Sequence, residues 1–97
     1  MSKLLEYYEH LHTYPELSKQ EAQTCIYLME TLEKMGYQPV RAGKYGVYTD
    51  LCIDENLPWV MLRSDMDALA VTEETGVAFA SQNPGVMHAC GHDSHMA

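Results

Sequence analysis

Basic residues are scarce in this sequence of 97 residues, which has six Lys and Arg against fourteen Asp and Glu and a net charge of -8. This balance repels nucleic-acid phosphates and anionic lipid surfaces, so neither is expected as a partner. Long apolar stretches are also lacking: no run approaches the roughly 20 residues that span a bilayer, and charged side chains interrupt the first ten residues, unlike a signal peptide. We therefore expect a cytoplasmic protein that does not enter a membrane.

Cysteine is sparse as well. Cys25, Cys52 and Cys90 are three in number and far apart, which argues against a disulfide framework and leaves two of them as ordinary small core residues. Apolar residues make up 46% of the chain and charged residues 21%, a composition typical of a packed core rather than of disorder. The length allows at most one domain, because domains commonly run to roughly 100–150 residues.

The first third of the chain predicts two helices. Apolar residues recur at helical spacing from residue 4 to residue 11, and Pro15 disfavours helical geometry in the residue before it, so a first helix of about three turns should end there. A second helix is predicted over about residues 19–35. Ser18 and Glu21 have the spacing of a capping box at its start, and Gly36 stands where a left-handed C-terminal cap is usually needed.

After Gly36 the pattern changes to one of strands. Residues 37–41 are short and β-prone, residues 47–53 alternate in polarity, and residues 59–62 (Trp-Val-Met-Leu) form the continuous apolar run expected of a central strand buried on both faces. Two helices followed by strands predict an α/β fold. In open α/β sheets the chemistry usually lies beyond the carboxyl end of a buried strand.

The segment over residues 87–95 (Met-His-Ala-Cys-Gly-His-Asp-Ser-His) holds three of the five histidines and one of the three cysteines. In an extended backbone His88, Cys90 and His92 would share a face. Imidazole and thiolate are zinc ligands, and Asp93 could hold a ligating histidine in the right tautomer. Three interpretations stay open: an open functional metal site, a closed structural zinc site that adds His95, and a partly buried cysteine among surface histidines.

Two carboxylates follow the predicted central strand directly. Asp65 and Asp67 share a face in extended geometry, so one could ligate or orient and the other support it. Alone, the pair is also what a solvated acidic strand end looks like. Arg63 beside them could act as their counter-ion, which is compatible with either interpretation.

Other polar residues give weaker signals. His10 and His12 are two positions apart and do not share a helical face, so we expect surface or capping histidines. Glu73 and Glu74 have no histidine at a defined spacing, and we interpret them as a solvated turn. The end of the chain, from Asp93 onward, has the pattern of the beginning of a helix.

Three blocks of the sequence resemble the N-terminal part of the metal-dependent amidohydrolases. They are Leu-His at residues 11–12 with Pro-Glu-Leu-Ser at 15–18, Leu-Arg-Ser-Asp-Met-Asp-Ala-Leu at 62–69, and the run from 85 to 97 that contains His-Ala-Cys-Gly-His-Asp-Ser-His. The family groups hippurate hydrolases, N-acyl-amino-acid amidohydrolases, N-acetyl-diaminopimelate deacetylases and auxin-conjugate hydrolases, related to aminoacylase and carboxypeptidase G. One departure is Ala70, where many members carry proline.

The resemblance implies a zinc-peptidase-like catalytic domain with a mixed sheet, of which residues 1–97 would be the N-terminal portion, without the lid or dimerisation domain. It implies two divalent metal ions (zinc, manganese, cobalt or nickel) and a metal-activated water that hydrolyses N-acyl amino acids to a carboxylic acid and an amino acid. Cys90 and His92 match metal ligands of the family, and Asp67 matches the acidic residue that supports them. Supporting or structural roles are assigned to Asp65, His88, Asp93 and His95.

The resemblance also indicates what the chain does not contain. Family members supply a Glu pair, one of which is the general base, and two further His ligands downstream of this region, so the 97-residue chain alone is expected to be inactive. Two alternatives remain. One is a small module that binds one structural metal ion through His88, Cys90 and His92, with His95 as the candidate fourth ligand. The other is an inactive truncated product that self-associates through an exposed sheet edge.

Overall fold

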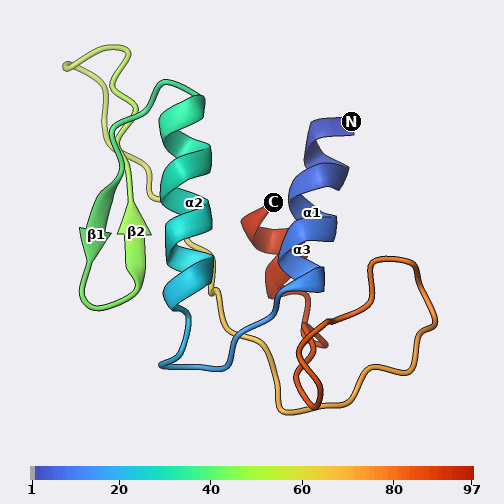
Figure 1. Ribbon diagram of the computed structural model, residues 1–97. Coiled ribbons are helices and arrows are strands. Elements are labelled where there is room, and N and C mark those ends of the chain that lie inside the picture. Colours follow the sequence, from blue (N-terminus) through green and yellow to red (C-terminus); the bar gives the residue numbers. More distant parts are fainter. Residues whose placement is uncertain (1) are drawn as a thin grey trace.

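The computed structural model describes residues 2–97 (Figure 1). Its elements are α1 (Ser2–Thr13), α2 (Ala22–Lys34), β1 (Val40–Ala42), β2 (Gly46–Tyr48) and α3 (His92–Met96). The hairpin of β1 and β2 lies against α2, and the short α3 packs beside α1 (Figure 1). The mixed α/β class, with two helices followed by strands, agrees with the prediction.

Both predicted helices are present. α1 ends at Thr13, just before Pro15, and α2 begins three residues later than expected but stops at the predicted place. Gly36 has a φ of 93°, which places it in the left-handed region. The N–H groups of Gly36 and Tyr37 donate to the carbonyl oxygens of Glu33 and Leu32, both at 3.0 Å. This is the Schellman arrangement that a glycine after a helix makes possible, and it confirms the predicted C-terminal cap.

The predicted capping box at the start of α2 is wrong. Glu21 is the N-cap residue but makes no side-chain cap bond, and Ser18 is exposed. The cap comes from Glu16 instead, whose carboxylate accepts from the N–H of Gln23 at 3.2 Å and from the N–H and hydroxyl of Thr24 at 2.6 and 2.7 Å. Residues 17–20 form a turn before the helix, so the helix starts too late for Ser18 to reach its first N–H groups.

The strands are shorter than predicted. β1 and β2 pair antiparallel as a hairpin, with Val40 opposite Tyr48, Arg41 opposite Val47 and Ala42 opposite Gly46. Residues 49–53, expected to continue the second strand, lie outside it. The sequence alternation at 47–53 therefore identified the position of a strand but not its extent, which depends on the length of its partner.

The prediction of a buried central strand at residues 59–62 is also wrong for this structure. Trp59 is 65% exposed, and the exposure rises to 95% at Leu62. A strand exists by pairing its backbone N–H and C=O groups with a neighbour. Within residues 2–97 the only sheet is the β1–β2 hairpin, so nothing described offers these residues a ladder.

The core is small and half polar. Its buried apolar residues are Leu11, Cys25, Ala68 and Val86, and its buried polar residues are His12, Thr24, His88 and Asp93. Cys25 is fully buried as expected, whereas Cys52 is exposed, contrary to the prediction. Among the helices of residues 2–97, none has the length and apolarity required to cross a membrane.

Candidate metal centre

Two short β-bridges hold the residues that follow the acidic pair, one against the chain before α2 and the other against the His/Cys segment. Ala68 pairs in parallel with Leu17, and its N–H donates to the carbonyl of Glu16 at 2.8 Å. The next residue, Leu69, pairs antiparallel with Met87 through two backbone hydrogen bonds of 2.9 and 3.0 Å. Asp67 is thereby fixed beside the segment that contains the histidines and Cys90, although some twenty residues of loop separate them in sequence.

His92, the first residue of α3, is held by Asp67. Its Nδ1 lies 2.9 Å from the carbonyl oxygen and 3.0 Å from the carboxylate Oδ1 of Asp67. A carbonyl oxygen can only accept a hydrogen bond, so Nδ1 carries the proton and the neutral ring has its lone pair on Nε2. This is the tautomer and the support that a ligating histidine usually has in a metalloprotein.

The second carboxylate, Asp65, approaches the other nitrogen of the same ring. Its Oδ2 lies 3.8 Å from Nε2 of His92, beyond hydrogen-bonding distance. Its Oδ1 accepts from the guanidinium of Arg63 at 2.6 Å, so the predicted counter-ion is confirmed. The pair Asp65 and Asp67 therefore flanks one imidazole from two sides, which neither carboxylate spacing nor charge alone indicated.

The His/Cys segment does not have the continuous extended geometry that the sequence analysis assumed. Gly91 has a φ of 92°, and α3 begins at the next residue. The hydroxyl of Ser94 donates to the carbonyl of Gly91 at 2.8 Å and closes this turn. His88, Cys90 and His92 consequently do not alternate along one strand: His88 is buried, the thiol residue Cys90 is exposed, and His92 belongs to a helix.

His88 has no partner among the described residues. The residue is 5% exposed, and neither ring nitrogen makes a hydrogen bond. Burial lowers the pKa of this imidazole, which favours the neutral ring. A neutral imidazole still has one donor and one acceptor, and leaving such groups unsatisfied costs about 1–3 kcal/mol each.

The donor set fits part of a metal centre. The free thiol of Cys90 and the Nε2 atom of His92 are donors that zinc and similar metals accept. In the part of the chain that the structure describes, no three His, Cys, Asp or Glu side chains gather so that they could hold one ion. The closed four-ligand zinc site that would use His88, Cys90, His92 and His95 is therefore not formed.

A buried ion-pair cluster that the sequence analysis missed lies behind this centre. His12 is 4% exposed, its Nδ1 lies 2.7 Å from Oδ2 of Asp93, and its Nε2 lies 2.9 and 3.0 Å from the two oxygens of Glu73. The predictions of a surface histidine and of a solvated turn at Glu73 are wrong. His10 and Glu74 are exposed, as expected. The signal available in the sequence was that His12 belongs to the first block of the family resemblance.

The charges in this cluster support one another. Burial lowers the pKa of His12, but the hydrogen bonds to Glu73 and Asp93 outweigh it and raise the pKa above its ordinary value. For Glu73, burial raises the pKa, whereas hydrogen bonds from the Thr75 hydroxyl, the Ser81 N–H and His12 lower it to about 2. With carboxylates on both sides, the ring donates from both nitrogens as an imidazolium.

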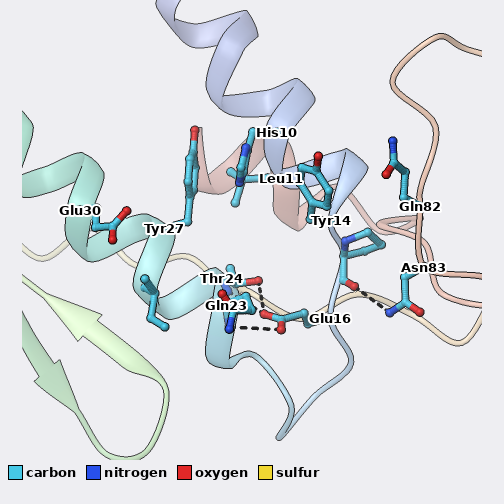
Figure 2. Close-up of a pocket in the computed structure, with 12 residues that line it drawn as sticks. His10, Leu11, Tyr14, Glu16, Gln23, Thr24, Tyr27, Glu30, Gln82 and Asn83 are labelled. Atoms are coloured by element: carbon cyan, nitrogen blue, oxygen red, sulfur yellow. Dashed lines mark hydrogen bonds between the residues drawn. The ribbon is translucent and has the colours of Figure 1, made fainter.

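A separate cavity of about 480 Å³ opens between α1 and α2. The rings of His10 and Tyr27, which both line it, stack directly on each other with centroids 3.7 Å apart (Figure 2). Glu16, which caps α2, and Asn83, whose side-chain amide donates to the Pro15 carbonyl at 3.1 Å, also line the cavity (Figure 2). None of the predicted metal-site residues lines this cavity.

Residues 61–97, which contain both carboxylates and the whole His/Cys segment, match the family described as Peptidase family M20/M25/M40. The chain resembles this family over residues 61–97. It is 47% identical over 90 residues to the N-acetyl-L-cysteine deacetylase of Bacillus subtilis (91% of this chain, 21% of the relative). It is 48% identical over 89 residues to the N-acyl-L-amino acid amidohydrolase of Geobacillus stearothermophilus (91% and 24%).

A solved M20 structure shares the fold. The Bacillus subtilis YXEP protein, described as a dinuclear metal binding peptidase from the M20 family, superposes with a TM-score of 0.93 at 37% identity and covers 98% of this chain. This chain covers 27% of that one. The chain thus spans about a quarter of the length of the M20 relatives that it matches.

Proposed function

We propose that this protein hydrolyses the amide bond of N-acyl amino acids at a centre of two divalent metal ions, to which this chain contributes Cys90 and His92 as ligands. The observation that carries the proposal is the His92 ring, which Asp67 holds with Nε2 free to bind. The relatives named as an amidohydrolase and a deacetylase, and the solved peptidase described as dinuclear, support the same chemistry.

The residues of this chain position and orient the two proposed metal ligands. Asp67 keeps the proton of His92 on Nδ1, and Gly91 turns the backbone so that His92 follows directly on the Cys90 segment. Metal ions bound there would lower the pKa of a water molecule and polarise the acyl carbonyl. The remaining ligands and the general base are proposed to come from outside residues 1–97, so the 97-residue chain alone should not catalyse the reaction.

The proposal also covers the metal, the substrate, the cellular location and the oligomeric state. The metal is proposed to be zinc, manganese, cobalt or nickel, since a thiolate and an imidazole suit ions of this kind. The substrate is a small N-acyl amino acid that releases a carboxylic acid and an amino acid. We place the protein in the cytoplasm and propose that it can form homo-oligomers.

The test is an assay of amino-acid release. The protein as encoded by its own gene is incubated with a panel of N-acetyl amino acids, before and after removal of metal with a chelator and after addition of Zn²⁺, Mn²⁺, Co²⁺ or Ni²⁺. We expect metal-dependent release that Cys90→Ala and His92→Ala abolish. Cys52→Ala, which removes the other exposed thiol, is the matched control and should be fully active. Hydrolysis that survives chelation or both ligand substitutions would contradict the proposal.

A further inference from the structure

α3 cannot hold its own conformation. It has five residues, His92–Met96, whereas isolated helices shorter than about 12–15 residues are marginal in water. Yet its first residue is the proposed metal ligand, whose ring must be held in one orientation for binding. The helix must therefore be fixed by contacts from elsewhere in the fold, and the structure shows which contacts do so.

One of these contacts is made by His12 of α1 to Asp93, the second residue of α3. Both oxygens of Asp93 are used: Oδ2 accepts from Nδ1 of His12 at 2.7 Å, and Oδ1 accepts from the N–H of Ser94 at 2.8 Å. Asp93 is 2% exposed and His12 is 4% exposed, so water competes little for the bond. α1 and α3 also pack against each other.

The His12 ring is itself held in place on every side. Glu73 accepts from its Nε2, and the rings of Tyr8 and Phe79 lie 5.8 and 5.6 Å from it, centroid to centroid. The Glu73 carboxylate is anchored in turn by the N–H of Ser81 at 2.8 Å. Two bonded nitrogens and two neighbouring aromatic rings hold the His12 side chain in one orientation, and this orientation places Nδ1 against Asp93.

We propose that His12 is a positioning residue for the metal centre: by holding Asp93 it fixes the start of α3 and thereby the orientation of His92. The proposal rests on the proposed function to the extent that His92 binds a metal ion. Nothing in it requires His12 to touch metal or substrate. Residues that hydrogen-bond a metal ligand directly typically change metal affinity by about 10–100-fold when they are removed. We take this range as the expectation for His12 as well, which acts on His92 through Asp93.

Two substitutions of His12 test its two hydrogen bonds separately. In His12→Asn the side-chain amide nitrogen can take the place of Nδ1 and keep the bond to Asp93, while the contact with Glu73 is lost. In His12→Gln the longer amide takes the place of Nε2 and keeps the bond to Glu73, while the contact with Asp93 is lost. Asp93→Ser removes the same contact from the other end. His10→Asn changes a histidine of the same helix whose ring stacks on Tyr27 of α2, and is the matched control.

The experiment titrates each variant of the protein, as encoded by its own gene, with Co²⁺. The absorption bands of the bound ion report both affinity and coordination geometry, and thermal unfolding is recorded in parallel. We expect His12→Gln and Asp93→Ser each to weaken Co²⁺ binding by about 10–100-fold and to alter the bands. The double variant of His12→Gln and Asp93→Ser should lose no more Co²⁺ affinity than either single variant, because both substitutions remove the same contact. His12→Asn and His10→Asn should retain the wild-type affinity and spectrum.

The outcomes separate this inference from the function on which it rests. If the wild-type protein binds no Co²⁺, the proposed function is overturned and the inference with it. If the wild type binds but His12→Gln and Asp93→Ser lose thermal stability without a change in Co²⁺ affinity or bands, His12 is merely structural and the inference alone is overturned. Equal loss of affinity in His12→Asn and His12→Gln also contradicts it. Should His12→Gln not fold, Asp93→Ser decides.

Discussion

Nδ1 of His12 lies 2.7 Å from Oδ2 of Asp93, although the two residues are 81 positions apart in the sequence. Glu73, 61 positions from His12, occupies the other nitrogen of the ring. One buried imidazole thus joins α1, the loop before the His/Cys segment and α3. The contact converts a helix too short to be stable into a fixed support for His92.

Acid should destabilise the protein through Glu73. Its pKa is lowered from 4.5 to about 2, so its contribution to stability is fully present above the unfolded value and is lost as the pH falls from about 4.5 to about 2. We expect Glu73→Gln to flatten the decline of the unfolding free energy over this range. Urea unfolding at a series of pH values measures it, with the exposed Glu74→Gln as control. Equal slopes in wild type and Glu73→Gln would show that Glu73 does not titrate in this way.

His12 should act in the opposite direction. Its pKa is raised in the folded protein, so its contribution is fully present below the ordinary value of 6.5 and is lost as the pH rises through the folded value. Replacement by Asn removes the titrating group. We expect the stability of wild type, relative to His12→Asn, to fall as the pH rises above 6.5, as measured by thermal unfolding. A constant difference across this range would contradict the ion-pair account.

Glu16 should stabilise α2 from outside the helix. Its carboxylate accepts from the N–H groups of Gln23 and Thr24, which have no partner within the first turn. We expect Glu16→Ala to lower the unfolding free energy by about 1–2 kcal/mol, the usual cost of losing an N-cap. Circular dichroism during urea unfolding checks it. Glu30→Ala, on the exposed surface of the same helix, is the control, and a loss of similar size there would remove the special role of Glu16.

Asp67 and Asp65 should differ in their effect on metal binding. Asp67 holds Nδ1 of His92, whereas Asp65 lies 3.8 Å from Nε2 and is paired with Arg63. Loss of a group that supports a metal ligand typically weakens binding by about 10–100-fold. We expect Asp67→Ala to weaken Zn²⁺ binding by an amount at the lower end of this range, because the Asp67 carbonyl still accepts a hydrogen bond from the ring. Asp65→Asn should have a smaller effect. Competition with a coloured chelator measures the Zn²⁺ affinity of both variants. A larger loss of affinity in Asp65→Asn than in Asp67→Ala would overturn the assignment of Asp67 as the residue that supports His92.

Gly91 and Gly36 offer a matched pair of glycines. Their φ values are 92° and 93°, and an added Cβ would meet nothing within 4 Å at Gly36 and only the Ser94 hydroxyl oxygen, at 3.7 Å, at Gly91. Alanine should therefore cost each about 1–2 kcal/mol of backbone strain and nothing in packing. We expect similar losses of thermal stability in Gly91→Ala and Gly36→Ala, but weaker metal binding in Gly91→Ala alone. Equal metal affinity in the two variants would show that the turn at Gly91 does not set the geometry of the site.

The sequence predicted those features whose causes lie within a few residues. The end of α1 before Pro15, the Schellman cap at Gly36 and the helix that starts beside Asp93 all follow from local backbone preferences. The family resemblance also implied that Asp67 supports the segment of Cys90 and His92, and the structure places Asp67 against His92. In each case the relevant residue types are close together or are part of one recognisable motif.

The failures of prediction have a common origin. The cap from Glu16, seven and eight residues before its partners, depends on the turn that precedes α2. The strand expected at residues 59–62 needs a neighbouring strand that residues 2–97 do not provide. Apolar periodicity indicates which residues favour burial or pairing, but it contains no information on whether a partner is present.

By itself the sequence determined the two long helices, their chain order before the strands, and the group of donors at Cys90 and His92. Only the tertiary structure decided that His12 is buried between Glu73 and Asp93 and that Asp67 fixes the tautomer of His92. Helix periodicity and caps act over one or two turns, whereas these hydrogen bonds exist because two loops bring distant residues within 3 Å. Burial then strengthens them, which no local pattern can indicate.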